Sequence, residues 1–212
     1  MTRPLEQWKG AFGDEYTAQN SAEVWLTPEK HASATAVWKR MLREIWPGLG
    51  SIMEVGANIG LNLVVLRELL PHVPLHAIEP NYVAWLTLVN RDIGVSAWNG
   101  AIEEWGPSGT FDLVFTSGVL IHIPPENLLA ATDKIVRASG RYVLCKEYFD
   151  VKPTMIPYHG QDNLLFKRDF GSWYLDHYPE LRCIDYGFWW SRLEPYCDNS
   201  TWWLFEFEKG AR

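Results

Sequence analysis

The residues best suited to chemistry lie in one short stretch, Ser51-Ile52-Met53-Glu54-Val55-Gly56-Ala57-Asn58-Ile59-Gly60-Leu61-Asn62. An apolar run ends at an acid, a glycine turn follows, and an apolar helical pattern begins. This order is typical of a strand, a tight loop and a helix, which is the place where open α/β sheets bind nucleotide-like ligands. The stretch therefore predicts a ligand of that kind at the end of the first strand.

The residue at position 58 bears on which nucleotide is bound. The dinucleotide fingerprint G-x-G-x-x-G has a middle glycine that lets the backbone approach a pyrophosphate. Asn58 takes that place here, and Glu54, two residues before the first glycine, would repel phosphate. A carboxylate can instead pair with a cationic amino-acid group. These residues disfavour a nicotinamide dinucleotide and favour S-adenosylmethionine, which has adenosine and an ammonium group but no phosphate.

A second acid, Glu79, closes the next predicted strand. It lies about twenty residues after the glycine turn, where a carboxylate can accept hydrogen bonds from both hydroxyls of a ribose. Because S-adenosylmethionine carries a 2′,3′-diol, Glu79 is the expected ribose ligand. Pro80 and Asn81 follow it and are expected to line the adenine edge.

The pattern Glu54-x-Gly56-x-x-x-Gly60 resembles motif I of the class I S-adenosylmethionine-dependent methyltransferases. The chain also resembles a narrower group, the pseudaminic-acid-biosynthesis-associated methylase family. Segments 8–16, 54–63, 111–123, 156–160 and 165–170 carry this resemblance. It implies an α/β, Rossmann-like fold with a seven-stranded, mostly parallel sheet and an antiparallel C-terminal hairpin. It also implies an enzyme that methylates a nonulosonic, pseudaminic-type sugar or its precursor. A cytoplasmic location is expected separately, because the three cysteines form no even disulfide set and are taken as reduced thiols.

The resemblance, together with the motif itself, assigns a set of cofactor-binding residues. Tyr16 falls in the segment that resembles the family's lid, and its hydroxyl is expected to bind the methionine carboxylate, with a core tyrosine as the alternative. Ala101 and Ile102 are expected beside adenine. The full set is Tyr16, Glu54, Gly56, Asn58, Gly60, Asn62, Glu79, Pro80, Ala101, Ile102, Thr116, Ser117 and Gly118.

The catalytic candidates follow from the chemistry of methyl transfer. An in-line displacement needs the acceptor placed against the methyl group and water excluded. A hydroxyl acceptor benefits from a base of near-neutral pKa, whereas an amine needs little more than orientation. His122 is the first candidate, His159 the second and Tyr148 a third, with a structural histidine as the alternative for the first two. N-methylation and O-methylation both stay open.

The substrate-binding candidates are Glu147, Tyr158, Lys167 and Arg168. Lys167 and Arg168 are expected to begin a helix, where cations oppose the helix dipole. That placement indicates an anionic acceptor, and a solvated basic face is the alternative.

The elements that must position these residues alternate along the chain, as in a parallel sheet with helical crossovers. We expect strands over about 51–55, 74–78, 95–98, 111–116 and 141–148, and helices over about 28–45, 60–70, 82–92, 124–139 and 167–178. The final runs, about 182–190 and 201–207, are expected to form the closing hairpin.

Composition limits the remaining options. A chain of 212 residues suits one domain, with residues 1–46 as an N-terminal cap or lid and 47–212 as a core that carries an acceptor-side insertion at about 150–165. A net charge of −7 argues against a nucleic-acid partner. No apolar run is long enough to span a membrane. Three cysteines lack metal spacing, so no metal site is expected.

Several alternatives remain. The aromatic residues of the last fifth of the chain, with many of its 12 tryptophans, fit either core packing or an exposed wall at a ligand pocket or a homodimer seam. The acceptor is a small molecule, either a sugar or another metabolite or natural product. A nicotinamide-dependent oxidoreductase and a non-catalytic S-adenosylmethionine-binding protein are the competing classes.

Overall fold

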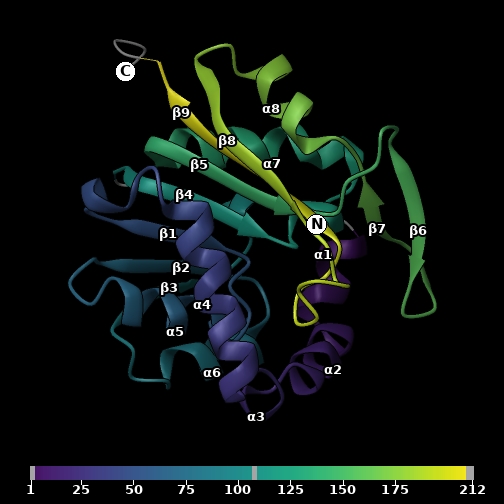
Figure 1. Cartoon of the computed structure of the whole chain (residues 1–212). Helices are drawn as coiled ribbons and strands as arrows, with labels where there is room; N and C mark the ends of the chain where they lie inside the picture. Colours follow the sequence, from purple (N-terminus) through teal and green to yellow (C-terminus); the bar gives the residue numbers. More distant parts are fainter. Residues whose placement is uncertain (1–2, 107–108, 209–212) are drawn as a thin grey trace. The chain divides into compact units, whose positions relative to one another are not determined.

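The computed structural model describes residues 3–106 and 109–208 of the chain (Figure 1). The chain folds as two compact units, residues 1–105 and 106–212. Within the described residues, no helix has both the length and the apolar character needed to cross a membrane.

The first unit contains three parallel strands, β1 (Ile52–Val55), β2 (Leu75–Glu79) and β3 (Val95–Asn99), in the order β3-β2-β1. All four residues of β1 are buried, as expected for a short strand covered on both faces. Glu54 pairs in register with Ala77, and Glu79 with Asn99. Because the strands are parallel, the loops that follow them meet at one edge.

The helices of the first unit begin with three short ones, α1 (Arg3–Lys9), α2 (Ala11–Gln19) and α3 (Ala22–Trp25), then α4 (Pro28–Leu42), α5 (Leu61–Leu69) and α6 (Tyr82–Val89), with 3₁₀ turns η1 (Trp46–Gly48) and η2 (Ile102–Glu104). The start of α4 agrees with the sequence expectation, since Pro28 occupies its first turn and Thr27 accepts a hydrogen bond from the Lys30 N–H. Helix α4 packs on α5, and α6 packs on β2 and β3.

The second unit contains β4 (Phe111–Ser117), β5 (Ser139–Glu147), β8 (Leu181–Trp189) and β9 (Ser200–Phe207), in the order β4-β5-β9-β8. Strands β4 and β5 are parallel, and β9 pairs antiparallel with both β5 and β8. The antiparallel C-terminal hairpin expected from the resemblance is therefore present. The helical elements are η3 (Leu120–His122), α7 (Pro125–Ala138), which packs on β4 and β5, and α8 (Phe170–His177).

The aromatic residues at the end of the chain divide between core and surface. Trp202 and Phe205 of β9 are buried. Tyr186 and Phe188 on the outer strand β8 are exposed, as is Trp190 just after it. Core packing thus explains the aromatics of β9, whereas Tyr186 and Phe188 of β8 lie on the surface.

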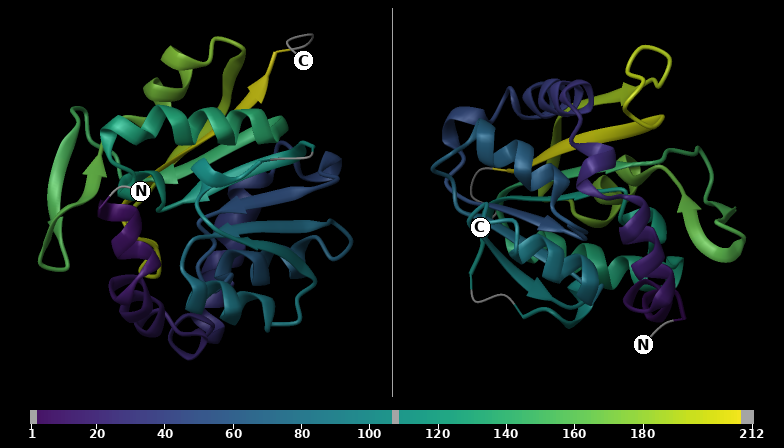
Figure 2. Two further views of the ribbon diagram at one scale, coloured as in Figure 1. Left: turned by 180° about the vertical axis from the view of Figure 1, so that it is seen from behind. Right: turned by 90° about the horizontal axis from the view of Figure 1, so that it is seen from below.

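Strands β6 (Thr154–Tyr158) and β7 (Gln161–Lys167) form a separate antiparallel hairpin, which stands apart from the other strands of its unit (Figure 2). The hairpin lies where the sequence predicted an acceptor-side insertion, at about 150–165, although its two strands were not predicted. The sequence also began a helix at Lys167, and that expectation was wrong. Lys167 ends β7, and α8 begins at Phe170 because the Asp169 carboxylate caps it, accepting a hydrogen bond from the Ser172 N–H at 2.9 Å. Lys167 and Arg168 therefore do not oppose a helix dipole.

Candidate functional site

The loop after β1 has the tight backbone that its glycines predicted. Gly56, Asn58 and Gly60 all have positive φ values, of 72°, 46° and 78°. Asn is one of the few non-glycine residues that adopts this left-handed conformation readily. The N–H groups of Gly56 and Ala57 both donate to the Ile78 carbonyl, which ties the loop to β2.

Gly60 has a packing role as well as a conformational one. A Cβ atom at this position would lie 2.3 Å from Cδ1 of Leu88, a buried residue of α6. The close approach that requires glycine here is therefore to a neighbouring helix. The sequence indicated two other reasons for glycine here, the close approach of a ligand and a plain turn.

Glu54 lies inside the first unit, with 1% of its surface exposed. Its Oε1 accepts a hydrogen bond from the Asn62 side-chain amide at 2.7 Å. The oxygen of that amide accepts a hydrogen bond from the Trp38 indole at 3.3 Å. Asn62 thus links the buried acid of β1 to α4, and the two motif residues Glu54 and Asn62 lie in direct contact.

Glu79 is also buried, at the carboxyl end of β2. Its Oε2 accepts a hydrogen bond from the Asn58 N–H at 2.6 Å, and its Oε1 accepts one from the Asn81 N–H at 2.7 Å. Burial raises the pKa of Glu79 to about 7, although both N–H groups stabilise the ionised form. This carboxylate therefore joins the loop after β1 to the loop after β2.

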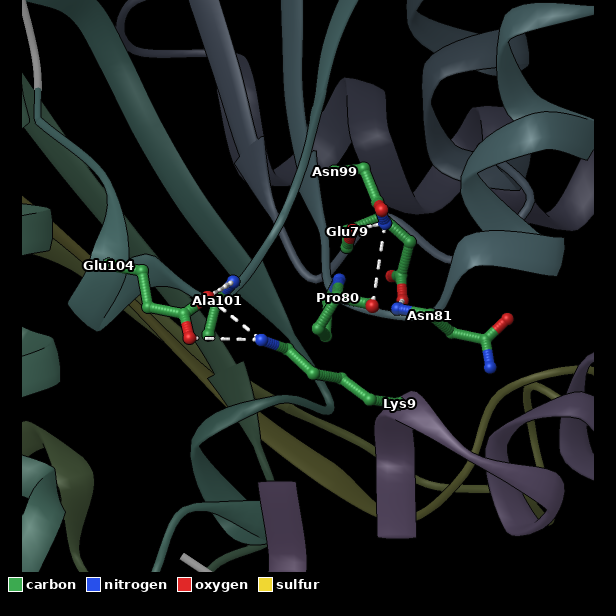
Figure 3. A network of polar contacts seen from close by, with 7 residues as sticks. All are labelled: Lys9, Glu79, Pro80, Asn81, Asn99, Ala101 and Glu104. Atoms are coloured by element: carbon green, nitrogen blue, oxygen red, sulfur yellow. Dashed lines mark hydrogen bonds and ion pairs between the residues drawn. The ribbon is translucent and has the colours of Figure 1, made fainter. Parts of the chain in front are cut away.

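The end of β3 and the loop that follows it contact the backbone of β2 (Figure 3). The Asn99 side-chain amide donates to the Glu79 carbonyl at 2.9 Å, and the Gly100 N–H donates to the same oxygen. The Ala101 N–H donates to the Glu104 carboxylate at 3.1 Å. Ala101 and Ile102 are both buried, so the structure brings the expected adenine-side residues to the same edge as Glu79.

The N-terminal helices are fastened to these loops by polar contacts that the sequence did not indicate. The Asn81 side chain caps α6 and also donates to the Asp14 carboxylate at 2.8 Å. Lys9 forms an ion pair with Glu104 at 2.8 Å (Figure 3). The expected lid is thus docked against the loops after β2 and β3. The only sequence signal was that Lys9 and Asp14 fall in segment 8–16.

Tyr16, the expected ligand of the methionine carboxylate, lies on α2. Its ring packs edge-on against Trp8, with centroids 5.2 Å apart, and it is partly exposed. One residue further on, the Thr17 hydroxyl donates to the Asn58 side-chain oxygen at 3.3 Å. The tyrosine therefore lies on the helix that contacts the motif loop.

In the second unit, the chain turns sharply after β4. Gly118 has a φ of 69°, and its N–H donates to the Lys146 carbonyl at 2.8 Å. The Lys146 ammonium lies 3.5 Å from the Ser117 hydroxyl. Thr116 is buried at the end of the same strand. These three expected cofactor residues, Thr116 to Gly118, are consecutive at the carboxyl end of a parallel strand.

Glu147 is fully buried at the end of β5. Its two oxygens accept hydrogen bonds from the N–H groups of Val119 at 3.2 Å and Ile121 at 3.3 Å. Burial raises the pKa of Glu147 to about 7, and the Thr116 hydroxyl and these N–H groups oppose the shift. The carboxylate thus holds the η3 turn, which carries His122.

His122, Tyr158 and His159 lie in one row. The His122 and Tyr158 ring centroids are 5.1 Å apart, and those of Tyr158 and His159 are 4.4 Å apart. Nδ1 of His122 donates to the Leu164 carbonyl at 2.6 Å, so Nδ1 carries the proton when the ring is neutral. Burial lowers the pKa of His122 to about 4, and His159 adds to the shift. The ring is therefore neutral at pH 7.

His159 and Gly160 are the two central residues of the turn between β6 and β7, with φ values of 47° and 72°. Two positive φ values are the mark of a type I′ hairpin turn. His159 is exposed at this tip.

Tyr148, the third catalytic candidate, follows β5 and is partly exposed. Its hydroxyl donates to the Asp198 carboxylate at 2.8 Å. The Lys167 ammonium lies 5.4 Å from the centre of its ring. A hydroxyl whose proton is held by a carboxylate is placed to accept a hydrogen bond rather than to donate a second one.

Among the residues that the structure describes, no group of three or more His, Cys, Asp or Glu side chains is arranged to hold a metal ion.

No protein-family model and no curated protein matches the chain. Solved structures of the same fold do. The Burkholderia thailandensis 1,6-didemethyltoxoflavin-N1-methyltransferase, bound to 1,6-didemethyltoxoflavin and S-adenosylhomocysteine, has a TM-score of 0.72 at 15% identity, over 99% of this chain and 92% of that one. The chain has the Rossmann-like methyltransferase fold.

Two other structures support the same conclusion. The magnesium protoporphyrin IX methyltransferase of Synechocystis PCC 6803, with bound S-adenosylmethionine, has a TM-score of 0.69 at 11% identity, covering 98% of this chain and 99% of that one. The plantazolicin methyltransferase BpumL, in complex with S-adenosylhomocysteine, has a TM-score of 0.70 at 11% identity, covering 97% and 94%. The expected fold class, with seven strands divided three and four between the units and a mostly parallel order, is confirmed.

Proposed function

We propose that this protein is an S-adenosylmethionine-dependent methyltransferase that acts on a small anionic acceptor. One observation carries the proposal. Glu79 presents a buried carboxylate at the carboxyl end of β2, bonded to the left-handed Asn58 of the motif loop, on a fold whose solved members bind this cofactor or its product. An acid at this place accepts hydrogen bonds from a ribose diol.

The residues of the first unit fit this cofactor. A carboxylate has about four lone-pair sites, and the backbone N–H groups of Asn58 and Asn81 take one on each oxygen of Glu79. Lone pairs therefore remain for the two ribose hydroxyls. Glu54 and Glu79 are two buried acids on neighbouring strands. Their negative charges suit a methyl donor that is a cation and disfavour a pyrophosphate.

When bound, the cofactor supplies a methyl group activated by its sulfonium. In our proposal Glu79 holds the ribose, the loop of Gly56, Asn58 and Gly60 lies against the cofactor, and Glu54 with Asn62 shapes the amino-acid end. The remaining expected contacts are Tyr16 to the carboxylate, Pro80, Ala101 and Ile102 to adenine, and Thr116, Ser117 and Gly118 to the methionine portion.

For the acceptor, we propose that His122 orients the reacting group. Because Nδ1 donates to Leu164 and the ring is neutral, the lone pair of Nε2 is suited to accept a hydrogen bond. A pKa of about 4 makes the ring a weak base, which favours orientation of an amine or an acidic hydroxyl over proton abstraction. Tyr158 and His159 continue the row, and Tyr148, Glu147, Lys167 and Arg168 complete the proposed acceptor-side set.

Two kinds of comparison bear on the chemical identity of the acceptor, the family resemblance in the sequence and the names of the solved structures. The resemblance to the pseudaminic-acid-associated methylases gives a nonulosonic sugar or its precursor as the candidate. The solved neighbours are named for magnesium protoporphyrin IX, plantazolicin and 1,6-didemethyltoxoflavin, so the fold serves chemically unrelated acceptors. Another small metabolite or natural product is therefore the second candidate.

Calorimetric titration with S-adenosylhomocysteine tests the cofactor assignment. We expect Glu79→Ala to weaken binding at least about tenfold, the loss of roughly one charge-assisted hydrogen bond. Glu29→Ala, at an exposed acid on α4, should leave the affinity unchanged. Undiminished affinity in Glu79→Ala would remove the ribose assignment, and no binding by the wild-type protein would overturn the proposed function.

Incubation with methyl-labelled S-adenosylmethionine and a metabolite extract, followed by mass spectrometry, tests the activity. A labelled small molecule is the expected result. Tight cofactor binding with no labelled product in any extract would instead indicate a non-catalytic binding protein.

A further inference from the structure

The second unit contains a pocket of about 210 Å³ beside the β6–β7 hairpin. Its walls come from η3 and the start of α7 on one side and from the hairpin and the start of α8 on the other. The lining residues that matter here are Leu120, Leu128, Met155, Phe166, Lys167 and Arg168. No aspartate or glutamate lines it. The pocket is thus apolar, with two cations and no acid among its lining residues.

Arg168 is the residue that points to a missing partner. Its Nη1 atom is buried and has no hydrogen-bond partner, although its guanidinium lies 4.4 Å from the ring centre of Trp173. A buried N–H of a cation without an acceptor is costly, and natural proteins rarely leave one. Burial also lowers the pKa of Arg168. Water does not reach this atom, but Arg168 lines the pocket, so an anion bound there can pair with its guanidinium.

Lys167 is the weaker of the two cations as an anion ligand. Its ammonium lies over the Tyr148 ring. Hydrogen bonds from the Thr154 hydroxyl and the Lys152 N–H lower the pKa of the exposed Asp150 carboxyl, and the Lys167 charge adds a smaller contribution. Part of its charge is therefore already balanced. Arg168 offers planar, paired N–H groups, the geometry that matches a carboxylate.

We propose that this pocket binds a carboxylate carried on an apolar body, with the anion on Arg168 and the body against Leu120, Leu128 and Phe166. Engineered apolar cavities of about 150 Å³ hold benzene, so this pocket suits a six-membered ring with a short side chain. That this ligand is the methyl acceptor rests on the proposed function, and it favours the second acceptor candidate, another metabolite or natural product, over a nonulosonic sugar. The binding itself does not, and the pocket is therefore testable without cofactor.

The test uses the full chain and three probes, measured by calorimetry or by NMR titration. The first is 3-phenylpropanoate, the second its neutral amide, 3-phenylpropanamide, and the third N-acetylneuraminate, a polar sugar carboxylate. We expect 3-phenylpropanoate to bind at least tenfold more tightly than either of the others. Equal binding of acid and amide, no binding of the acid, or tighter binding of the sugar acid would each overturn the proposal.

Two variants locate the site. Arg168→Gln should lower the affinity for 3-phenylpropanoate to that of the amide, whereas Arg192→Gln, at an exposed arginine, should change nothing. Met155 lines the pocket and has 55% of its surface exposed, so Met155→Glu adds a negative charge without disturbing the core. This variant should lower the affinity for 3-phenylpropanoate at least tenfold and leave the affinity for the amide unchanged. Acid binding that survives both Arg168→Gln and Met155→Glu would overturn the assignment.

The outcomes separate this inference from the proposed function. Binding of S-adenosylhomocysteine should be unaffected by Arg168→Gln. If S-adenosylhomocysteine binds and 3-phenylpropanoate does not, the pocket assignment fails and the cofactor assignment stands. If the reverse holds, the pocket is a carboxylate site in a protein that is not a methyltransferase of this kind.

Discussion

The Glu79 carboxylate accepts the Asn58 N–H at 2.6 Å, and this bond joins the ends of β1 and β2. The other carboxylate oxygen accepts the Asn81 N–H, so one side chain sets the positions of two loops. The Glu79 carboxylate, which we propose binds the ribose, is therefore already held in position before the cofactor binds. A preorganised group loses little further entropy on binding.

The raised pKa of Glu79 makes cofactor affinity depend on pH. Ribose hydroxyls donate to the ionised carboxylate, which is only partly populated below the pKa of about 7. Affinity for S-adenosylhomocysteine should therefore rise between pH 5 and about 7 and level off above that, with proton release on binding. Calorimetry in buffers of different ionisation enthalpy measures both. Glu79→Gln should flatten the profile, and an unchanged profile in that variant would contradict the assignment.

Gly60→Ala should destabilise the protein by about 1–3 kcal/mol from its left-handed backbone alone, and by more because the new methyl group meets Leu88 at 2.3 Å. Gly160→Ala is the matched control, since its φ of 72° is similar but nothing lies within 4 Å of the added atom. Urea denaturation of both variants measures the difference. Equal losses would show that the contact with Leu88 relaxes without cost.

Glu147 should make stability decrease as pH rises. Its pKa is about 7 in the folded protein and near 4.5 when unfolded, so the folded state binds more protons between these values. The contribution is fully present below about pH 4.5 and is lost as pH rises through 7. Urea denaturation at intervals from pH 4.5 to 7.5 should show a shallower decline for Glu147→Gln than for wild type, while Glu126→Gln, at an exposed acid, should follow wild type.

His122→Asn should lower turnover on the order of tenfold or more and leave S-adenosylhomocysteine affinity unchanged. Asparagine can keep the donor to the Leu164 carbonyl but lacks Nε2. Because the pKa of His122 is about 4, kcat/KM should show no inflection from this residue between pH 5.5 and 8. An inflection near 6.5 that disappears in His122→Asn would show that the ring acts as a base of ordinary strength.

The fold and the cofactor-side loops were largely predictable from sequence because their signals are local. The run Ile52–Val55, the left-handed positions of the loop and the acid at the end of β2 all depend on neighbours in the chain. The contacts that dock the N-terminal helices were not predictable. Asn81 bonds to Asp14 across 67 positions, and Lys9 to Glu104 across 95, so no spacing rule indicates them.

Strands β6 and β7 were not predicted from sequence, and there is a physical reason. Its strands are half-exposed, and β6 carries Pro157, which weakens the sequence pattern of a strand. The basic pair Lys167–Arg168 was assigned to a helix, whereas Asp169 three residues before Ser172 is the capping signal that sets the true start. That Nη1 of Arg168 lacks a hydrogen-bond partner follows from its burial in the folded chain, so the sequence could not have indicated it.

Strands β6 and β7 pair with each other and with no other described strand. Exchanging this hairpin for one of different length or composition would therefore leave all strand pairs of the seven-stranded sheet intact. Its own register is set by the tight turn at His159 and Gly160. The segment is therefore a suitable graft point, where the lining of the proposed carboxylate pocket can be varied while the larger sheet stays as it is.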